Sequence, residues 1–326
     1  MKSIYRVAVL AAAATAALAL AGNALATQKL EVSQSGNSLT VRVSKTDADP
    51  QPAKITIYIP GGYTLNTSQP FGTVIGTTEG EVVANQLGGI PVPLTGDVVT
   101  DDPAKHVSDV CAPGMHQAVW VLRLSVANQT TLVPVYIDPT SGAETALGMA
   151  KGQLCLSRGD TPTGTPLHFA RFTVNGVFTP PVGATRWTGF WTPYASGGVP
   201  NPAGTVETRS FVGPGAVTLT TRVTSKKKKR VTVAGAVTQS GLGVATKVSI
   251  LINGKGRASA NSNATGRYTK KVRGKGRRST FQARVTVAAR DLGADACANP
   301  SQPPFPCVSA TAGGFTATSR KVTVRF

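Results

Sequence analysis

The chain has few of the residues from which most catalytic and metal sites are built. It contains three histidines, none in an H-E-x-x-H motif, and no serine stands in a G-x-S-x-G motif. The four cysteines include no C-x-x-C pair that would indicate a zinc site. These absences predict a protein that is not an enzyme and that needs no cofactor.

Long apolar runs are also missing after the first 26 residues, so no later segment is expected to cross a membrane as a helix. The first 26 residues have the pattern of a secretory signal peptide. Lys2 and Arg6 precede the apolar stretch Val7–Ala21, and Ala24-Leu25-Ala26 is a cleavage motif of small residues. We expect cleavage there, and a mature chain that is secreted and extracellular or associated with the cell envelope.

Acidic residues are scarce in the last third of the chain. Residues 27–222 contain 12 Lys and Arg against 13 Asp and Glu. Residues 223–326 contain 20 Lys and Arg against only Asp291 and Asp295, a net charge of +18. A field of this strength attracts anionic partners and repels cationic ones.

Length and charge together predict two domains. The first is expected over 27–222 and the second over 230–326, joined by a basic linker at 223–229. Both regions show short alternating strands between Gly, Pro and Asn turns, which predicts an all-β protein of two β-sandwich domains. The second has the length and strand number of an immunoglobulin-like sandwich.

Four cysteines permit three pairings. Closeness in sequence favours disulfides between Cys111 and Cys155 and between Cys297 and Cys307, one in each domain. The export signal supports this expectation, because disulfides persist in oxidising compartments.

One short stretch of the first domain gathers aromatic residues. Trp187, Phe190, Trp191 and Tyr194 fall within eight residues. Aromatic faces stack on sugar rings, so the stretch is a candidate glycan-binding surface. Large aromatic residues also fill protein cores, and the sequence leaves both interpretations open.

An acidic loop is the other candidate site in this domain. Asp97, Asp101, Asp102, His106 and Asp109 lie close together in sequence, and Ca²⁺ binds carboxylate oxygens. Their spacing matches no EF-hand or nonapeptide motif, so no metal is expected. We expect these residues to cap a short helical turn and to face solvent.

Strand parity predicts that three basic segments of the second domain share one end. Successive antiparallel strands reverse direction, so the start of the first strand and the turns at Asn253-Gly254 and Gly274-Lys275-Gly276 fall together. We expect the first domain to enter at this same end. The candidate polyanion-binding residues are Lys226, Lys227, Lys228, Lys229, Arg230, Lys255, Arg257, Arg273, Lys275, Arg277 and Arg278.

These basic segments have two interpretations. They can dock onto an anionic polymer, such as an acidic cell-wall polymer, an anionic lipid, an acidic polysaccharide or extracellular DNA, or they can form a solvated face that keeps the protein dispersed. Sequence-specific nucleic-acid binding is not expected, because no aromatic residues are interleaved with the cations to stack on bases.

Two resemblances add to these expectations. The segments Tyr58–Tyr63, Cys111–Gly114 and Gly204–Ser210 resemble a group of uncharacterised secreted bacterial proteins, which implies export and a β-rich fold but no activity. In the second domain, V-x-G-x-V at 233–237, G-V-A-x-K-V-x-I at 243–250 and N-A-T-G-R-Y at 263–268 are similar to carboxypeptidase-regulatory-like, prealbumin-type domains.

Stalk repeats of the collagen-adhesin B type share this second resemblance, which implies a non-catalytic sandwich that spaces or supports another domain. The Lys–Asn isopeptide bond of such repeats is not expected, because the region has no Glu and only two late Asp. The leading hypothesis is a secreted, non-enzymatic binding or structural protein that adheres to anionic polymer. The alternatives are a glycan-binding protein or hydrolase accessory that uses the stretch 187–194, and a stalk without a ligand.

Overall fold

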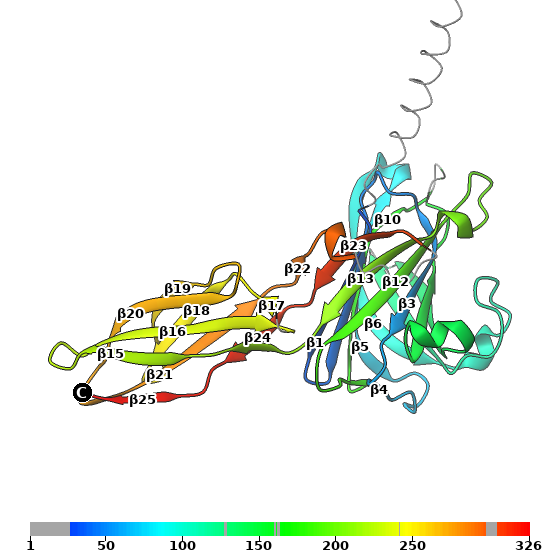
Figure 1. Ribbon diagram of the computed structural model, residues 1–326. Coiled ribbons are helices and arrows are strands. Elements are labelled where there is room, and N and C mark those ends of the chain that lie inside the picture. The colour runs from blue at the N-terminus through cyan, green and yellow to red at the C-terminus, as the bar shows by residue number, and fades with distance from the viewer. Residues whose placement is uncertain (1–26, 127–128, 160, 162–163, 241, 298–304) are drawn as a thin grey trace, which may run out of the picture.

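The computed structural model describes residues 27–126, 129–159, 161, 164–240, 242–297 and 305–326. Strands dominate, which confirms the all-β prediction. Figure 1 shows a broad first domain and a slender second domain that extends from its side. In the described part of the chain, no helix is long and apolar enough to cross a membrane.

The first domain is made of strands and five short 3₁₀ turns. Its strands are β1 (Lys29–Ser35), β2 (Ser38–Ser44), β3 (Pro52–Ile59), β4 (Thr64–Leu65), β5 (Val74–Ala84), β6 (Ile90–Asp101), β7 (Ala118–Val126), β8 (Gln129–Pro139), β9 (Ala150–Cys155), β10 (Leu167–Asn175), β11 (Phe178–Thr179), β12 (Thr185–Pro193), β13 (Val206–Val212), β22 (Arg290–Asp291) and β23 (Cys307–Ala312). The 3₁₀ turns are η1 (Asn85–Leu87), η2 (Pro103–His106), η3 (Gly142–Ala146), η4 (Pro202–Gly204) and η5 (Ala294–Cys297). Thirteen of these strands form one sheet in the order β1-β2-β10-β5-β6-β7-β8-β9-β3-β12-β13-β23-β22, and β4 pairs with β11.

This sheet curls so far that β1, at one end of the strand order, lies against β13 and β23 near the other end. The Val32 amide of β1 donates to Ser210 Oγ on β13 at 2.8 Å. Thr311 Oγ1 on β23 donates to the Leu30 carbonyl of β1 at 2.6 Å. Side-chain hydrogen bonds therefore close the curl between strands that are not neighbours in the backbone ladder. The two walls of the first domain come from one continuous sheet.

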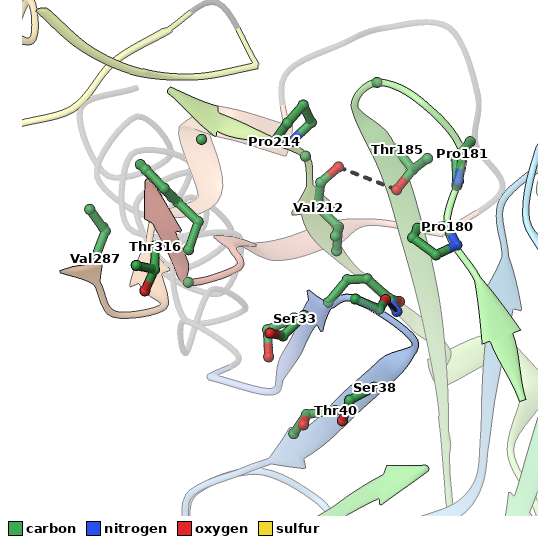
Figure 2. A pocket seen from close by; sticks show the side chains of 18 of the residues that line it. Ser33, Ser38, Thr40, Pro180, Pro181, Thr185, Val212, Pro214, Val287 and Thr316 are labelled. Atoms are coloured by element: carbon green, nitrogen blue, oxygen red, sulfur yellow. Dashed lines mark hydrogen bonds between the residues drawn. The ribbon is translucent and has the colours of Figure 1, made fainter. Parts of the chain in front are cut away.

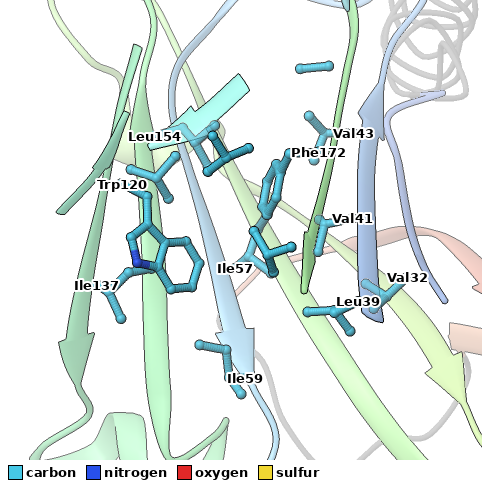
Figure 3. Packing of buried hydrophobic residues seen from close by; sticks show 14 of the residues in the cluster. Val32, Leu39, Val41, Val43, Ile57, Ile59, Trp120, Ile137, Leu154 and Phe172 are labelled. Atoms are coloured by element: carbon cyan, nitrogen blue, oxygen red, sulfur yellow. The ribbon is translucent and has the colours of Figure 1, made fainter. Parts of the chain in front are cut away.

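The concave side of the curl holds the main apolar core. Strand β2 shows why, because its alternating Leu39, Val41 and Val43 are buried while the residues between them are only half-buried. Figure 3 shows these three side chains with Trp120 and Ile57 from facing parts of the sheet. The alternation of apolar and polar residues along the strand therefore decides which of its faces is buried.

The second domain is a sandwich of two five-stranded sheets. Its strands are β14 (Gly215–Val217), β15 (Thr220–Ser225), β16 (Arg230–Gln239), β17 (Leu242–Gly243), β18 (Lys247–Ile252), β19 (Lys255–Asn261), β20 (Arg267–Arg273), β21 (Arg278–Val287), β24 (Phe315–Thr318) and β25 (Val322–Arg325). In one sheet, β14, β15, β17 and β20 pair with β16, and the other joins β19-β18-β21 to β24 and β25. The core between them includes Val231, Val233, Ile250 and Phe281, all at 0% exposure.

The domain boundaries differ from the predicted 27–222 and 230–326. Strands β14 and β15 pair with β16 of the second domain. The chain later returns, because β23 pairs in parallel with β13 and β22 pairs with β23 in the first sheet. The first domain therefore comprises 27–213 and 290–312, and the second 214–289 and 313–326. The supposed linker 223–229 is the end of β15 and a hairpin turn within the second domain.

Both predicted disulfide pairings, Cys111–Cys155 and Cys297–Cys307, are confirmed. The expectation of one bridge in each domain is wrong. The second bridge joins η5 to β23, which belongs to the first sheet. The parallel pairing of β23 with β13 connects residues about a hundred positions apart, which a local reading of the sequence does not detect.

Candidate functional site

Three basic segments meet at one end of the second domain. Arg230, at the start of β16, is the register partner of Arg273 at the end of β20. The amide of Gly274 donates to the Lys229 carbonyl at 2.8 Å, which joins the first segment to the turn after β20. The Asn253 amide donates to the Thr280 carbonyl at 2.9 Å, which holds the third segment beside β21. We call this end the basic tip, defined by Lys226–Arg230, Lys255, Arg257, Arg273, Lys275, Arg277 and Arg278.

The basic tip lies at the opposite end of the second domain from the predicted junction. In Figure 1 the turn between β15 and β16 is at the far end of the slender domain, beside the C-terminal label. The prediction is wrong because β14 and β15 precede the lysine run inside the second domain. Those two strands carry the chain from the junction to the tip before the lysines begin.

The second domain has no acidic side chain with which to neutralise the tip. Residues 214–289 and 313–326 contain 20 Lys and Arg and no Asp or Glu. Asp291 belongs to the first sheet and pairs with Lys29 of β1. Arg325 joins the tip as the register partner of Arg278, a contribution that sequence reasoning missed. The signal for it is present in the sequence, because residues 321–326 alternate polar and apolar side chains and so predict a strand that contains Arg325.

The turn between β15 and β16 presents its lysines to solvent. Lys226, Lys227 and Lys228 are exposed, and the Lys228 amide donates to Ser225 Oγ at 3.2 Å. Lys229 has a φ of 51°, in the left-handed region that usually favours glycine or asparagine. A cationic side chain therefore occupies a backbone position that a smaller residue fills at lower conformational cost.

The aromatic stretch of the first domain divides between two faces of β12. Trp187 and Trp191 are each 1% exposed and belong to the core. The Trp187 indole donates to Tyr63 Oη at 3.4 Å, and the Trp191 indole donates to Thr208 Oγ1 at 3.0 Å. These two tryptophans are therefore not available to a ligand. Phe190 and Tyr194 lie on the opposite, outer face of the strand.

Phe190 and Tyr194 line a groove of about 750 Å³ on this outer face. We call it the aromatic groove. The ring of Phe190 packs edge-to-face against Tyr58 at 5.4 Å and against Phe305 at 5.1 Å between centroids. The polar side chains that share the lining are Lys54, Thr56, Glu144, Lys151, Gln153, Thr192 and Thr205.

An ion pair fixes one wall of the aromatic groove. Lys151 Nζ lies 2.8 Å from Glu144 Oε2, and Tyr58 Oη donates to Glu144 Oε1 at 2.9 Å. Burial and this hydrogen bond both raise the pKa of Tyr58, so its hydroxyl stays a donor. The groove thus combines ring faces with oriented polar groups, the two elements with which proteins recognise sugars.

A second hollow of about 630 Å³ lies where the two domains meet. Figure 2 shows Ser38 and Thr185 of the first domain across from Val287 and Thr316 of the second. Among the described residues its lining contains no charged side chain, and Gln34 contributes a buried carbonyl oxygen that has no hydrogen-bond partner there. The described lining of this interdomain cleft therefore offers polar hydroxyl and amide groups but no counter-ion.

The acidic loop does not form a metal site among the described residues. His106 lies between Asp109 Oδ2 at 2.8 Å and Asp101 Oδ2 at 3.2 Å, and Asp102 caps η2 by accepting from the Ala104 amide. Burial lowers the pKa of His106, but the hydrogen bonds to Asp109 and Asp101 outweigh it and leave that pKa raised. Asp97 lies apart, 3.9 Å from Arg123.

Comparisons with known proteins add little to this geometry. No family model and no curated protein matches the chain. One similar solved structure comes from a study of how a 1.5-MDa bacterial ice-binding adhesin is retained at the host cell surface. It is 13% identical, the match covers 92% of this chain and 96% of that one, and the TM-score is 0.20. Such a low TM-score supports no argument about fold or function.

Proposed function

We propose that this chain is a secreted, non-enzymatic binding protein that attaches to an anionic polymer through the basic tip. The observation that carries the proposal is the convergence of three basic segments at the free end of a domain that has no acidic side chain. Asp291, on β22 at the other end of that domain, is paired with Lys29 of the first domain. The tip therefore has no acidic side chain within its own domain to neutralise it.

The register of the strands strengthens this proposal. Arg230 faces Arg273 and Arg278 faces Arg325 as direct cross-strand partners. Like charges directly opposite each other on a sheet repel and destabilise it. A polymer that places phosphate, sulfate or carboxylate groups between them removes this repulsion on binding.

The test uses the whole chain from Thr27 onward on immobilised polyphosphate and heparin. Several simultaneous contacts predict a steep loss of affinity, about 10³-fold or more between about 50 and 200 mM salt. The triple variant Lys226→Gln, Lys227→Gln, Lys228→Gln should elute at clearly lower salt and show a shallower salt dependence.

A matched control separates the tip from net charge. The variant Lys247→Gln, Arg267→Gln, Arg284→Gln removes the same three charges from exposed positions of β18, β20 and β21 that lie away from the tip. It should elute close to the unmodified chain. Equal losses in the two triple variants, or no salt-sensitive retention at all, refute attachment through the tip.

The aromatic groove supports a second candidate function, the binding of a glycan. The specific observation is that Phe190 stands between Tyr58 and Phe305 beside the oriented Lys151–Glu144 pair. Each of these groups is of a type that contacts sugar rings or their hydroxyls. In this candidate function the second domain serves as a stalk.

Two substitutions in the same strand test the glycan proposal. Phe190→Ala should abolish binding on a glycan array of bacterial and host polysaccharides while the melting temperature changes little. Trp191→Ala should instead lower the free energy of unfolding by about 3–5 kcal/mol, because it empties a fully buried site. Glycan binding that is unchanged in Phe190→Ala excludes the groove.

A further inference from the structure

We propose that the first domain binds an acyl chain in an apolar cavity at one end of its curled sheet. The cavity has a volume of about 640 Å³, within the usual range for small-molecule sites. It is separate from the basic tip and is not part of the aromatic groove. Nothing in the polyanion or glycan proposals requires it.

The cavity is encircled by the sheet. Most of its lining comes from β2, β10, β5, β6, β7, β8, β9 and β3, which are eight consecutive neighbours in the sheet order. Val43 on β2 and Ile55 on β3 stand at the two ends of that run, yet both line the same space. The sheet therefore wraps around the cavity, which favours a slender ligand entering end-on over a folded partner docking on a face.

The cavity continues the hydrophobic core toward solvent. Buried core residues form its inner part, and Val43 and Leu154 are labelled at this end of the cluster in Figure 3. Leu94 is partly buried in its wall, whereas Leu87 and Leu132 reach its rim with 58% and 61% exposure. Apolar surface that runs on from a cavity to an exposed rim is a feature of ligand-binding grooves.

The chemistry of the lining selects the class of ligand. Among the described residues, no Asp, Glu, Lys, Arg or His contributes to it, and its polar members include the amides of Gln51, Gln86 and Gln129. An apolar tail is therefore accommodated along the wall, while the head group, charged or uncharged, meets these amides or lies in solvent at the rim. The ligand class is a single acyl chain, from either a free fatty acid or a membrane lipid.

The cavity opens away from the second domain. Strand β2 places Val43 in the cavity, while Ser38 at its other end lines the interdomain cleft. The cavity and the second domain are thus at opposite ends of the curled sheet. A tip bound to an anionic surface leaves the cavity accessible.

The experiment measures displacement of dansyl-labelled undecanoic acid from the chain beginning at Thr27. Octanoate, decanoate and dodecanoate should compete with affinities that rise about three- to fourfold for each added methylene group. Dodecanol should compete nearly as well as dodecanoate, because the lining holds no cation. Competition that is independent of chain length overturns the proposal.

Two variants locate the site. Leu132→Glu places a charge at the exposed rim and should weaken binding at least tenfold without changing the melting temperature. Thr130→Glu is its matched control, because this exposed neighbour on β8 does not line the cavity, and it should bind like the unmodified chain. Equal binding by both variants overturns the proposal.

Neutral phosphatidylcholine vesicles distinguish the two sources of an acyl chain, since the basic tip has no attraction for them. Competition by vesicles as well as by dodecanoate, with both lost in Leu132→Glu, assigns a membrane lipid. Competition by dodecanoate alone assigns a free fatty acid. Binding to vesicles without competition by dodecanoate indicates surface adsorption and refutes the cavity site.

Discussion

At the scale of single residues, Thr27 and Asp49 connect the expected cleavage site to the stability of the fold. The Thr27 amide nitrogen lies 2.7 Å from Asp49 Oδ1, and the Thr46 amide donates to Asp49 Oδ2 at 2.8 Å. Burial raises the pKa of Asp49, but the bonds from Thr27 and Thr46 outweigh it and leave that pKa lowered. Thr27 directly follows the Ala24-Leu25-Ala26 motif.

A chain that begins at Thr27 therefore places an α-ammonium group beside a buried carboxylate. We expect it to be more stable than a chain that begins at Ala26 by about 1–2 kcal/mol, because a hydrogen bond between charged groups replaces one from a neutral amide. Asp49 has a lowered folded pKa, so this gain is present above the unfolded pKa and is lost as the pH falls through the folded value.

Urea unfolding of both chains at neutral and acidic pH measures this difference. The substitution Asp49→Asn in each background completes a double-mutant cycle and should remove the difference between the two starting points. A difference that persists with asparagine at this position shows that the added residue acts by another route.

Strand β12 shows how far the sequence defines the candidate site at the residue scale. The cluster of aromatic residues is visible in the sequence, and successive side chains of a strand must point to opposite faces. The sequence does not say which face of β12 is turned inward. The structure places Trp191 inside and Phe190 outside, so half of the predicted glycan surface is core and the other half lines a groove.

At the scale of elements, Arg209 attaches the returning segment to the first sheet. Arg209 Nε lies 2.6 Å from Glu207 Oε1, and Arg209 Nη1 donates to the Cys297 carbonyl of η5 at 3.0 Å. Both side chains of the pair are nearly fully buried. The pair thus joins β13 to the segment that leads into β23.

Arg209→Ala should be strongly destabilising, because it leaves Glu207 buried without its partner. The expected loss is about 3–5 kcal/mol in the free energy of unfolding, measured by urea denaturation. The double variant Arg209→Met, Glu207→Leu removes both charges and should recover most of the loss. If the single variant is as stable as the unmodified chain, the pair does not hold the segment.

The hairpin between β15 and β16 explains why the sequence predicted the strands but misplaced the domain boundary. Val231, Val233 and Val237 follow an alternating pattern that predicts a strand over 230–237, and β16 covers it. The turn before it, Lys226–Lys229, contains no Gly, Asn or Pro to indicate a turn, and the change in charge there predicted a linker. Lys229 in the left-handed conformation supplies the turn instead.

At the scale of the whole molecule, the chain crosses between the domains three times. It passes from β13 to β14, from β21 to β22 and from β23 to β24. Gln239 fastens the junction, because its amide donates to the Gly313 carbonyl at 2.7 Å and its carbonyl accepts from Arg290 at 2.9 Å. Three connections restrict the junction far more than the single basic linker that the sequence predicted.

The uneven distribution of charge predicts that anions act differently on the two domains. The second domain carries all its charge with one sign, whereas the first is close to neutral, so anions should stabilise only the second. Adding short-chain polyphosphate should slow amide hydrogen exchange in β16 and β20, whose ends form the basic tip, and leave β3 unchanged. The triple variant of Lys226, Lys227 and Lys228 should lose part of this protection. Charge repulsion at the basic tip acts on the second domain alone. If polyphosphate slows amide hydrogen exchange equally in both domains, the effect comes from the solvent and a specific anion site is refuted.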